Sequence, residues 1–257
     1  MHGTTEKYHA MHYVVTLDGV PSAPTENTGR LNAFMSMWGD CKIEFEVCTG
    51  TMLSRQGAGL TETILRCLSS AYESGADAVF FYEDDALLFE ESFCDEDYRR
   101  ELLMSSPDDA LLLLIGAHDF WIDQEKLDEK LGGNPERFSR GDSEYLPLLQ
   151  SFGTYGFAVL RNKMQRVISL LNAELEECTK QARKCSPDLC IYQFDKNTEG
   201  VYVIDPLIVD HKRGTYSNSW KKFRKDTQNG EIWMGKRKVR DMLAKKLIKT
   251  WKNTKGF

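Results

Sequence analysis

The chain has 257 residues, of which 41% are hydrophobic and 28% are charged, the balance of a globular protein that can bury a substantial core. Its longest strongly apolar run, Ala110 to Ala117, is too short to span a bilayer. The first residues lack the basic and then apolar pattern of a secretory signal, so we expect a cytoplasmic protein.

Seven cysteines are scattered along the chain, with no CxxC pair and no histidines at zinc-ligand spacing. An odd count without a secretion signal favours free thiols in a reducing compartment. We therefore predict that the cysteines are unpaired.

The net charge of −6 hides an asymmetry between the two parts of the chain. From Lys212 to Phe257 there are 15 basic and 3 acidic residues, whereas the remainder has 18 basic and 36 acidic residues. This asymmetry predicts that the C-terminal segment meets an anionic surface or packs on the acidic body.

The first part of the chain alternates between strand and helix patterns. Apolar residues predict, in order, a strand at 12–17, a helix at 25–38, a strand at 43–48, a helix at 60–72 and a strand at 78–82. This order predicts an α/β fold whose central sheet is mostly parallel, with crossover helices on both faces. The two glycines of Gly57-Ala58-Gly59 are a weak signal for a phosphate loop, and helix packing or a flexible donor loop explains them better.

The second part continues the pattern less regularly. We expect a strand at 111–116, a polar excursion at 123–145, a strand at 151–160, a helix around 164–175, a helical turn at Ser186 and a last strand at 201–210. The strand at 111–116 would place His118 and Asp119 beyond its end. We divide the chain into a tail (1–11), one α/β domain (12–218) and a basic segment (219–257).

Three consecutive acids, Glu83, Asp84 and Asp85, follow the buried strand at 78–82. Like charges at contact distance repel, and burial raises the cost. A divalent cation such as Mg²⁺ or Mn²⁺ resolves this conflict, because carboxylate oxygens are its preferred ligands. A solvated acidic turn is the alternative, but apolar residues resume at once from Ala86 to Phe89, which favours the metal site.

Six segments resemble one known family in composition and order. They are Tyr13 to Asp18 with Arg30, Gly59-Leu60 and its helix, Phe81-Tyr82-Glu83-Asp84-Asp85, Gly153-Thr154-Tyr155-Gly156-Phe157 with Arg161, Ser186-Pro187-Asp188, and Pro206 with His211. They resemble glycosyltransferase family 25, the lipopolysaccharide galactosyl/glucosyltransferases and procollagen galactosyltransferases. The resemblance implies a GT-A-like fold, a nucleotide-sugar donor (a UDP-sugar above all) and a glycan or glycoprotein acceptor.

The resemblance also suggests roles for individual residues. Thr16, Leu17, Asp18, Arg30, Glu83, Asp84 and Lys212 would bind the donor, and Asp85, Asp84 and His211 would bind the metal. An imidazole ligand favours Mn²⁺ over Mg²⁺, although His211 could equally begin the basic tail. Asp188 would be the base that takes the acceptor's proton in an inverting reaction, or an ordinary helix-start acid, with Asp119 beside Trp121 as the second candidate.

Two other function classes remain open. A sugar nucleotidyltransferase on a similar sheet needs a glycine-rich, basic loop after the first strand, and Gly19-Val20-Pro21-Ser22 is not one. A non-catalytic carbohydrate-binding protein is the other alternative, and the intact acidic trio argues against it.

The basic segment at 219–257 predicts an amphipathic helix. Met242, Leu243, Leu247, Ile248 and Trp251 share one face at helical spacing, opposite lysines. Such a helix suits an anionic membrane surface or the acidic body of the protein, and no motif accompanies it that would suggest nucleic acid.

Overall fold

The computed structural model describes residues 8–21, 23, 25, 28–51, 58–131, 144–181, 185, 199–205, 207–211, 216–217 and 222–223. The strands of the main sheet are β1 (Ala10–Thr16), β2 (Phe45–Thr49), β3 (Ala78–Glu83), β5 (Ala110–Ile122), β6 (Glu144–Leu160) and β7 (Gly200–Asp205). Two small antiparallel pairs join β4 (Ala86–Leu88) to β8 (Val209–His211) and β9 (Tyr216–Ser217) to β10 (Lys222–Phe223). The helices are α1 (Arg30–Met37), α2 (Ala58–Ser74), the 3₁₀ helix η2 (Glu91–Cys94), α3 (Glu96–Met104), α4 (Gln124–Leu131) and α5 (Arg161–Gln181).

The main sheet has the order β2-β1-β3-β6-β5-β7. β1 is parallel to β2 and β3, and β5 is parallel to β7, whereas β6 is antiparallel to β3, β5 and β7. All strands of this sheet except β6 therefore run in one direction, and the predicted α/β class with a mostly parallel sheet is confirmed.

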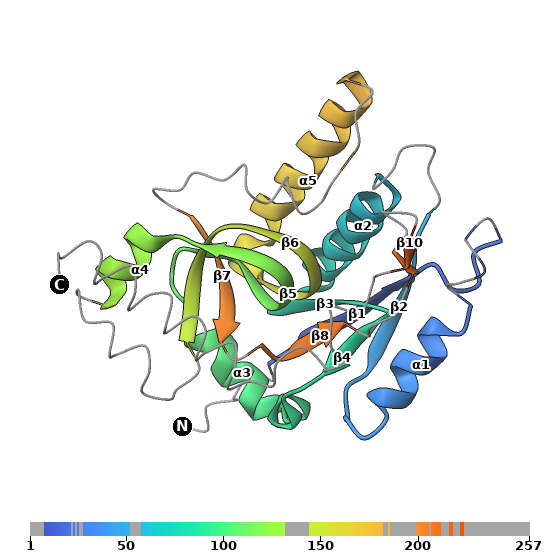
Figure 1. Cartoon of the computed structure of the whole chain (residues 1–257), viewed down its shortest axis with the longest axis horizontal. Helices are drawn as coiled ribbons and strands as arrows, with labels where there is room; N and C mark the ends of the chain where they lie inside the picture. Colours follow the sequence, from blue (N-terminus) through green and yellow to red (C-terminus); the bar gives the residue numbers. More distant parts are fainter. Residues whose placement is uncertain are drawn as a thin grey trace.

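Helices cover both faces of the sheet (Figure 1). α2 and α5 lie on one face, and α1 and α3 lie on the other. β3 supplies both cores, because successive side chains of a strand point to opposite faces. Val79 and Phe81 pack with Leu68 of α2 and Met164 of α5, while Phe80 and Tyr82 belong to the aromatic core of the α1 face.

The last predicted strand, 201–210, is two strands in different sheets. β7 ends at Asp205, and β8 crosses over the main sheet to pair with β4. The sequence places Pro206 between them, a residue with no N–H for a ladder hydrogen bond. Ile208 N donates to Ile115 O at 2.9 Å, which fixes the crossing.

Two glycines make room for this crossing. A Cβ on Gly116 would lie 2.6 Å from the backbone oxygen of Val209, and one on Gly156 would lie 2.9 Å from Val209 Cγ2. Only glycine allows so close an approach without a shift of the backbone. The crossing brings His211 opposite Ala86, and Ala86 is the residue that follows Asp85.

Two predictions about the middle of the chain were wrong. The strand predicted at 111–116 continues to Ile122, so Asp119 lies within β5, paired with Phe152, and not beyond its end. The excursion predicted at 123–145 contains α4, whose Leu127 is fully buried, and β6 begins at Glu144. Backbone pairing in a long antiparallel ribbon does not require an apolar side chain at each position, which is why the polar residues of β5 misled the prediction.

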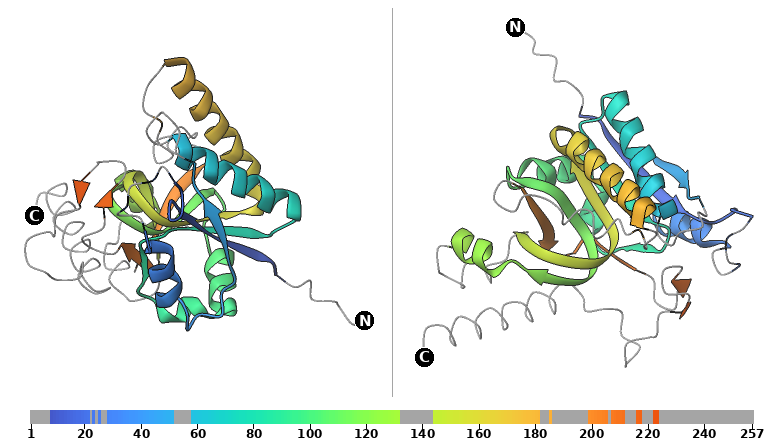
Figure 2. Two further views of the ribbon diagram at one scale, coloured as in Figure 1. Left: turned by 90° about the vertical axis from the view of Figure 1, so that its right-hand side faces the viewer. Right: turned by 90° about the horizontal axis from the view of Figure 1, so that it is seen from above.

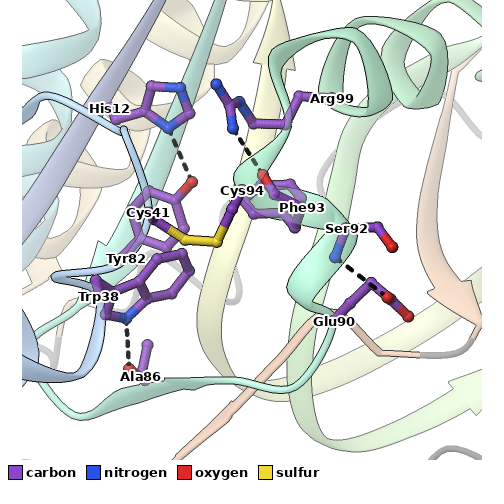
Figure 3. Close-up of a disulfide and its surroundings, with 10 residues drawn as sticks. All are labelled: His12, Trp38, Cys41, Tyr82, Ala86, Glu90, Ser92, Phe93, Cys94 and Arg99. Atoms are coloured by element: carbon purple, nitrogen blue, oxygen red, sulfur yellow. Dashed lines mark hydrogen bonds between the residues drawn. A yellow bond between two sulfur atoms is a disulfide. The ribbon is translucent and has the colours of Figure 1, made fainter.

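The prediction of unpaired cysteines was also wrong for four residues. Disulfides join Cys41 to Cys94 and Cys48 to Cys67. The prediction of a reducing compartment depended on free thiols, so these disulfides remove its support. The partners are 53 and 19 residues apart in sequence, so the fold alone brings them together. Figure 3 shows the first disulfide beside the aromatic core, where it ties the chain after α1 to η2.

Within the described parts of the chain, none of the helices has the length and apolar character that a membrane crossing requires. The predicted amphipathic helix at 242–251 lies outside the described residues, as does Ser186 with its predicted helical turn.

Candidate active site

The ends of two neighbouring parallel strands form the candidate site. β1 ends at Thr16 and β3 ends at Glu83, so the residues that follow these strands meet at one edge of the sheet. Asp84 and Asp85 form the turn between β3 and β4. This carboxyl edge is where ligands bind in open α/β sheets.

A hydroxyl links the two strand ends. Thr16 Oγ1 donates a hydrogen bond to Asp84 Oδ2 at 2.6 Å and accepts one from the Asp18 backbone N–H at 2.9 Å. Thr16 is buried, so the hydroxyl is well placed to hold the Asp84 carboxylate in one orientation.

Arg30 bridges the two carboxylates of the turn. Its Nη2 lies 2.6 Å from Asp84 Oδ1 and 2.9 Å from Asp85 Oδ2. Arg30 is the first residue of α1, and Asp18 Oδ2 accepts the backbone N–H of the next residue, Leu31, at 3.2 Å. Gly29 precedes the helix with φ of 81°, a conformation that favours glycine. The loop after β1 therefore aims Arg30 at the acidic turn.

These charges are largely removed from water. Asp84 is 6% exposed, Asp85 is 3% exposed, and the Arg30 side chain is 14% exposed. Burial raises the pKa of Asp84 to about 6, although Arg30 and the hydrogen bond from Thr16 act in the opposite direction. Two ionised carboxylates and one guanidinium leave a charge of −1, which suits a further cation.

The donor atoms of this site fit a hard divalent cation. Asp84 and Asp85 supply carboxylate oxygens, and the pairing of β8 with β4 brings the backbone of His211 next to the turn. Among the side chains that the structure describes, Glu83 does not converge with Asp84 and Asp85 as a three-ligand set. A metal at this turn would therefore need another ligand, such as His211 or a donor phosphate.

Side chains on the α1 face of the sheet hold both ends of the acidic turn in place. Trp38 Nε1 donates to Ala86 O at 3.1 Å, directly after the two aspartates. Tyr82, which precedes the acids, is buried, and its hydroxyl lies 2.9 Å from His12 Nδ1 (Figure 3). The Trp38 contact could not be predicted from the sequence, because its partner is a backbone carbonyl 48 residues away.

The structure thus brings together Thr16, Asp18, Arg30, Asp84 and Asp85, all of which the sequence placed at the site. Leu17 follows β1, and its carbonyl accepts Val20 N at 3.1 Å. Glu83 ends β3, paired with Val15.

The other predicted residues are less completely described. For Asp119 and His211 the structure describes only the backbone, in β5 and β8 respectively. Asp188 and Lys212 lie outside the described residues. Gly59, part of the suspected phosphate loop, packs against the chain instead: a Cβ there would lie 1.8 Å from Thr51 O.

Comparison with known proteins gives similarity of structure only. No family model and no curated protein matches the chain. A glycosyltransferase involved in glycosylation of the major capsid of PBCV-1 is 11% identical, with 92% of this chain and 98% of that chain covered and a TM-score of 0.43. The galactosyltransferase LgtC, in complex with donor and acceptor sugar analogs, is 15% identical, with 92% and 96% covered and a TM-score of 0.40. The inositol-1-phosphate CTP transferase from T. maritima is 14% identical, with 93% and 96% covered and a TM-score of 0.40. At such identities and scores, the assignment of function has to rest on the residues of this chain.

Proposed function

We propose that this protein is a metal-dependent glycosyltransferase, which moves a hexose from a nucleotide-diphosphate sugar to a hydroxyl of a glycan or glycoconjugate with inversion. A UDP-sugar is the proposed donor, by resemblance to glycosyltransferase family 25. The observation that carries the proposal is the buried network of Thr16, Arg30, Asp84 and Asp85 at the carboxyl ends of β1 and β3.

Asp85, Asp84 and His211 are the proposed ligands of Mn²⁺ or Mg²⁺. When bound, the cation would act as a Lewis acid on the leaving diphosphate. Thr16 orients Asp84 for this task through its 2.6 Å hydrogen bond.

Arg30 has a second role in this proposal. Its guanidinium now neutralises Asp84 and Asp85, and its planar fork of donors also suits phosphate oxygens. We expect Arg30 to exchange part of its contact with the aspartates for the donor's diphosphate, assisted by Lys212. Glu83, Leu17 and the Asp18 loop would contact the nucleoside.

Asp188 is the proposed base. Its carboxylate would accept the proton of the acceptor hydroxyl as that oxygen bonds to the anomeric carbon and the bond to the diphosphate breaks. Asp119 is the second candidate for this role.

Ligand-dependent thermal stability tests the proposal. The unfolding midpoint would be measured with Mn²⁺ and each of UDP, GDP and CDP, because a ligand that binds only the native state raises it. We expect the largest rise with Mn²⁺ and UDP together, and loss of that rise in Asp85→Asn. Asp97→Asn is the matched control, since the Asp97 side chain is 82% exposed on α3.

The same panel separates the alternatives. Stabilisation by a nucleoside triphosphate with a sugar phosphate, and release of pyrophosphate, would indicate a nucleotidyltransferase. Stabilisation by glycans alone, with no response to any nucleotide, would indicate a binding protein. Either result would overturn the proposed transfer.

A further inference from the structure

A second cluster of ligand-type side chains, which shares no residue with the acidic turn, lies where α5 faces α2. Glu174 and Cys178 are four residues apart on α5, and therefore lie on one face of that helix. Cys185 follows the end of α5, and Thr61 belongs to α2. All four are buried, with exposed fractions of 0 to 1%. Figure 2 shows α2 and α5 packed along one another on this face of the sheet.

The side chains of this cluster converge on one point. The Sγ atoms of Cys178 and Cys185 and a carboxylate oxygen of Glu174 all lie within 4.8 Å of one another. Cys178 Sγ is 3.1 Å from Glu174 Oε1, and Cys185 Sγ is 3.6 Å from Thr61 Oγ1. Zinc with bond lengths near 2.3 Å to sulfur and 2.1 Å to oxygen separates tetrahedral ligands by about 3.5 to 3.8 Å, which these groups can reach with small rotations.

We propose that Glu174, Cys178 and Cys185 form a zinc site that fastens Cys185 to the end of α5, beside Thr61 of α2. Two thiolates and a carboxylate select a borderline-soft divalent cation such as Zn²⁺ over Mn²⁺ or Mg²⁺, which prefer oxygen ligands. The Thr61 hydroxyl offers a neutral oxygen at the side of Cys185. This site does not depend on the proposed sugar transfer.

Binding requires that both thiols lose their protons to solvent, since the thiolate is the ligand. Without a metal, burial and the hydrogen bonds with Cys185 and Glu174 raise the pKa of Cys178 above its ordinary value. The cation must therefore displace a tightly held proton, and its affinity should increase with pH.

Cobalt titration of the full chain tests the site, with its two disulfides intact. The Asp85→Asn background keeps the acidic turn from contributing. We expect one equivalent of Co²⁺ to produce a thiolate-to-cobalt charge-transfer band, and Zn²⁺ to abolish that band by displacement. Cys178→Ser and Cys185→Ser should lose the band, and Glu174→Gln should weaken cobalt binding by at least about tenfold. Glu176→Gln, an exposed acid on the same helix, should leave it unchanged.

The protein with its native residues provides a second readout if a variant does not fold. Zn²⁺ should raise the unfolding midpoint and should protect Cys178 and Cys185 from alkylation, as mapped by mass spectrometry. Absence of the band while both thiols are reduced would overturn the proposal. So would a band that survives in Cys178→Ser, or a disulfide found at Cys178 or Cys185 in the native chain.

Discussion

The two buried clusters differ in their atoms and in how the sequence encodes them. The turn at Asp84 and Asp85 offers oxygen ligands and already contains the cationic side chain of Arg30. The cluster of Glu174, Cys178 and Cys185 offers two sulfur atoms and one carboxylate. One chain can therefore present a hard site at the edge of its sheet and a softer one between two helices, with little competition for the same ion.

The two clusters also differ in their expected roles. We expect ligands to exchange at the acidic turn, and we expect the sulfur cluster to hold the structure together. The acidic turn lies at the carboxyl edge of the sheet, where ligands bind in open α/β sheets, and we propose that Arg30 there exchanges partners. The sulfur cluster lies on and after α5, and we propose that it only holds the structure together. Substitutions in the first should affect chemistry, and those in the second should affect stability.

The largest effect should come from the proposed catalytic base. If Asp188 is the base, Asp188→Asn should lower kcat by about 10²- to 10⁴-fold, with donor affinity nearly unchanged, because a base acts in the transition state. Steady-state kinetics together with calorimetric binding of the donor would measure both quantities. A collapse of donor affinity would make Asp188 a donor ligand and Asp119 the better candidate.

The two disulfides sharpen the comparison between the faces of the sheet. Cys41–Cys94 closes the longer loop on the face that braces the acidic turn, and Cys48–Cys67 joins β2 to α2. Loop entropy predicts that removal of the first costs about 4 kcal/mol and removal of the second about 3 kcal/mol. Urea unfolding of the two double Cys→Ala variants measures these free energies. Equal stability of the parent and both variants would show that the cross-links contribute nothing.

The crossing of β8 over the main sheet can be disturbed by adding a single methyl group. Gly116→Ala places a Cβ against the backbone of Val209 and should reduce the free energy of unfolding by about 1–3 kcal/mol. Because β8 carries His211 to the acidic turn, Mn²⁺-dependent stabilisation should fall as well. Gly75→Ala is an instructive control, since Gly75 has a positive φ but open space around it; it should destabilise through the backbone alone and leave the Mn²⁺ response intact.

Another prediction concerns pH. Burial, with a smaller contribution from Arg99, lowers the pKa of His12 from 6.5 to about 3. The unfolded state therefore binds a proton at position 12 between pH 6.5 and 3 that the folded state does not, and the contribution of His12 to stability falls as the pH is lowered through this window. The raised pKa of Asp84 acts in the opposite direction below about pH 6. The limiting slope is about 1.4 kcal/mol per pH unit.

His12→Gln should remove this contribution to the pH dependence in urea titrations between pH 7 and pH 4.5, while both proteins keep the opposite contribution of Asp84. His9→Gln, at an exposed position, is the control and should retain it. The same slope in the His12→Gln protein would mean that another group titrates.

Contiguous patterns were predictable from the sequence. The apolar run of β3 is buried on both faces, and two of the acids that follow it are part of the candidate site. The helices α2 and α5 also lie where apolar residues predicted them, at 60–72 and around 164–175. Each of these features is encoded within a few residues of chain, where periodicity and local sterics decide the outcome.

Features built from distant residues escaped prediction. The partner cysteines are far apart in sequence, and Thr61 and Cys185 are 124 residues apart. The helix α3 has a weak apolar stripe, although Asp95 caps its first turn by accepting from the N–H groups of Asp97 and Tyr98. Tertiary packing determines these features, and the spacing of residues along the chain carries no signal for it.

Calorimetric titration of Mn²⁺ in the presence of UDP tests the central claim most directly, with the parent protein, Asp85→Asn and Asp97→Asn compared at pH 7.5. The account predicts one Mn²⁺ bound to the parent and to Asp97→Asn, and at least a hundredfold loss of affinity in Asp85→Asn, about 2.7 kcal/mol. Unchanged Mn²⁺ affinity in Asp85→Asn would contradict it, because the buried acidic turn would then not be where the cation binds.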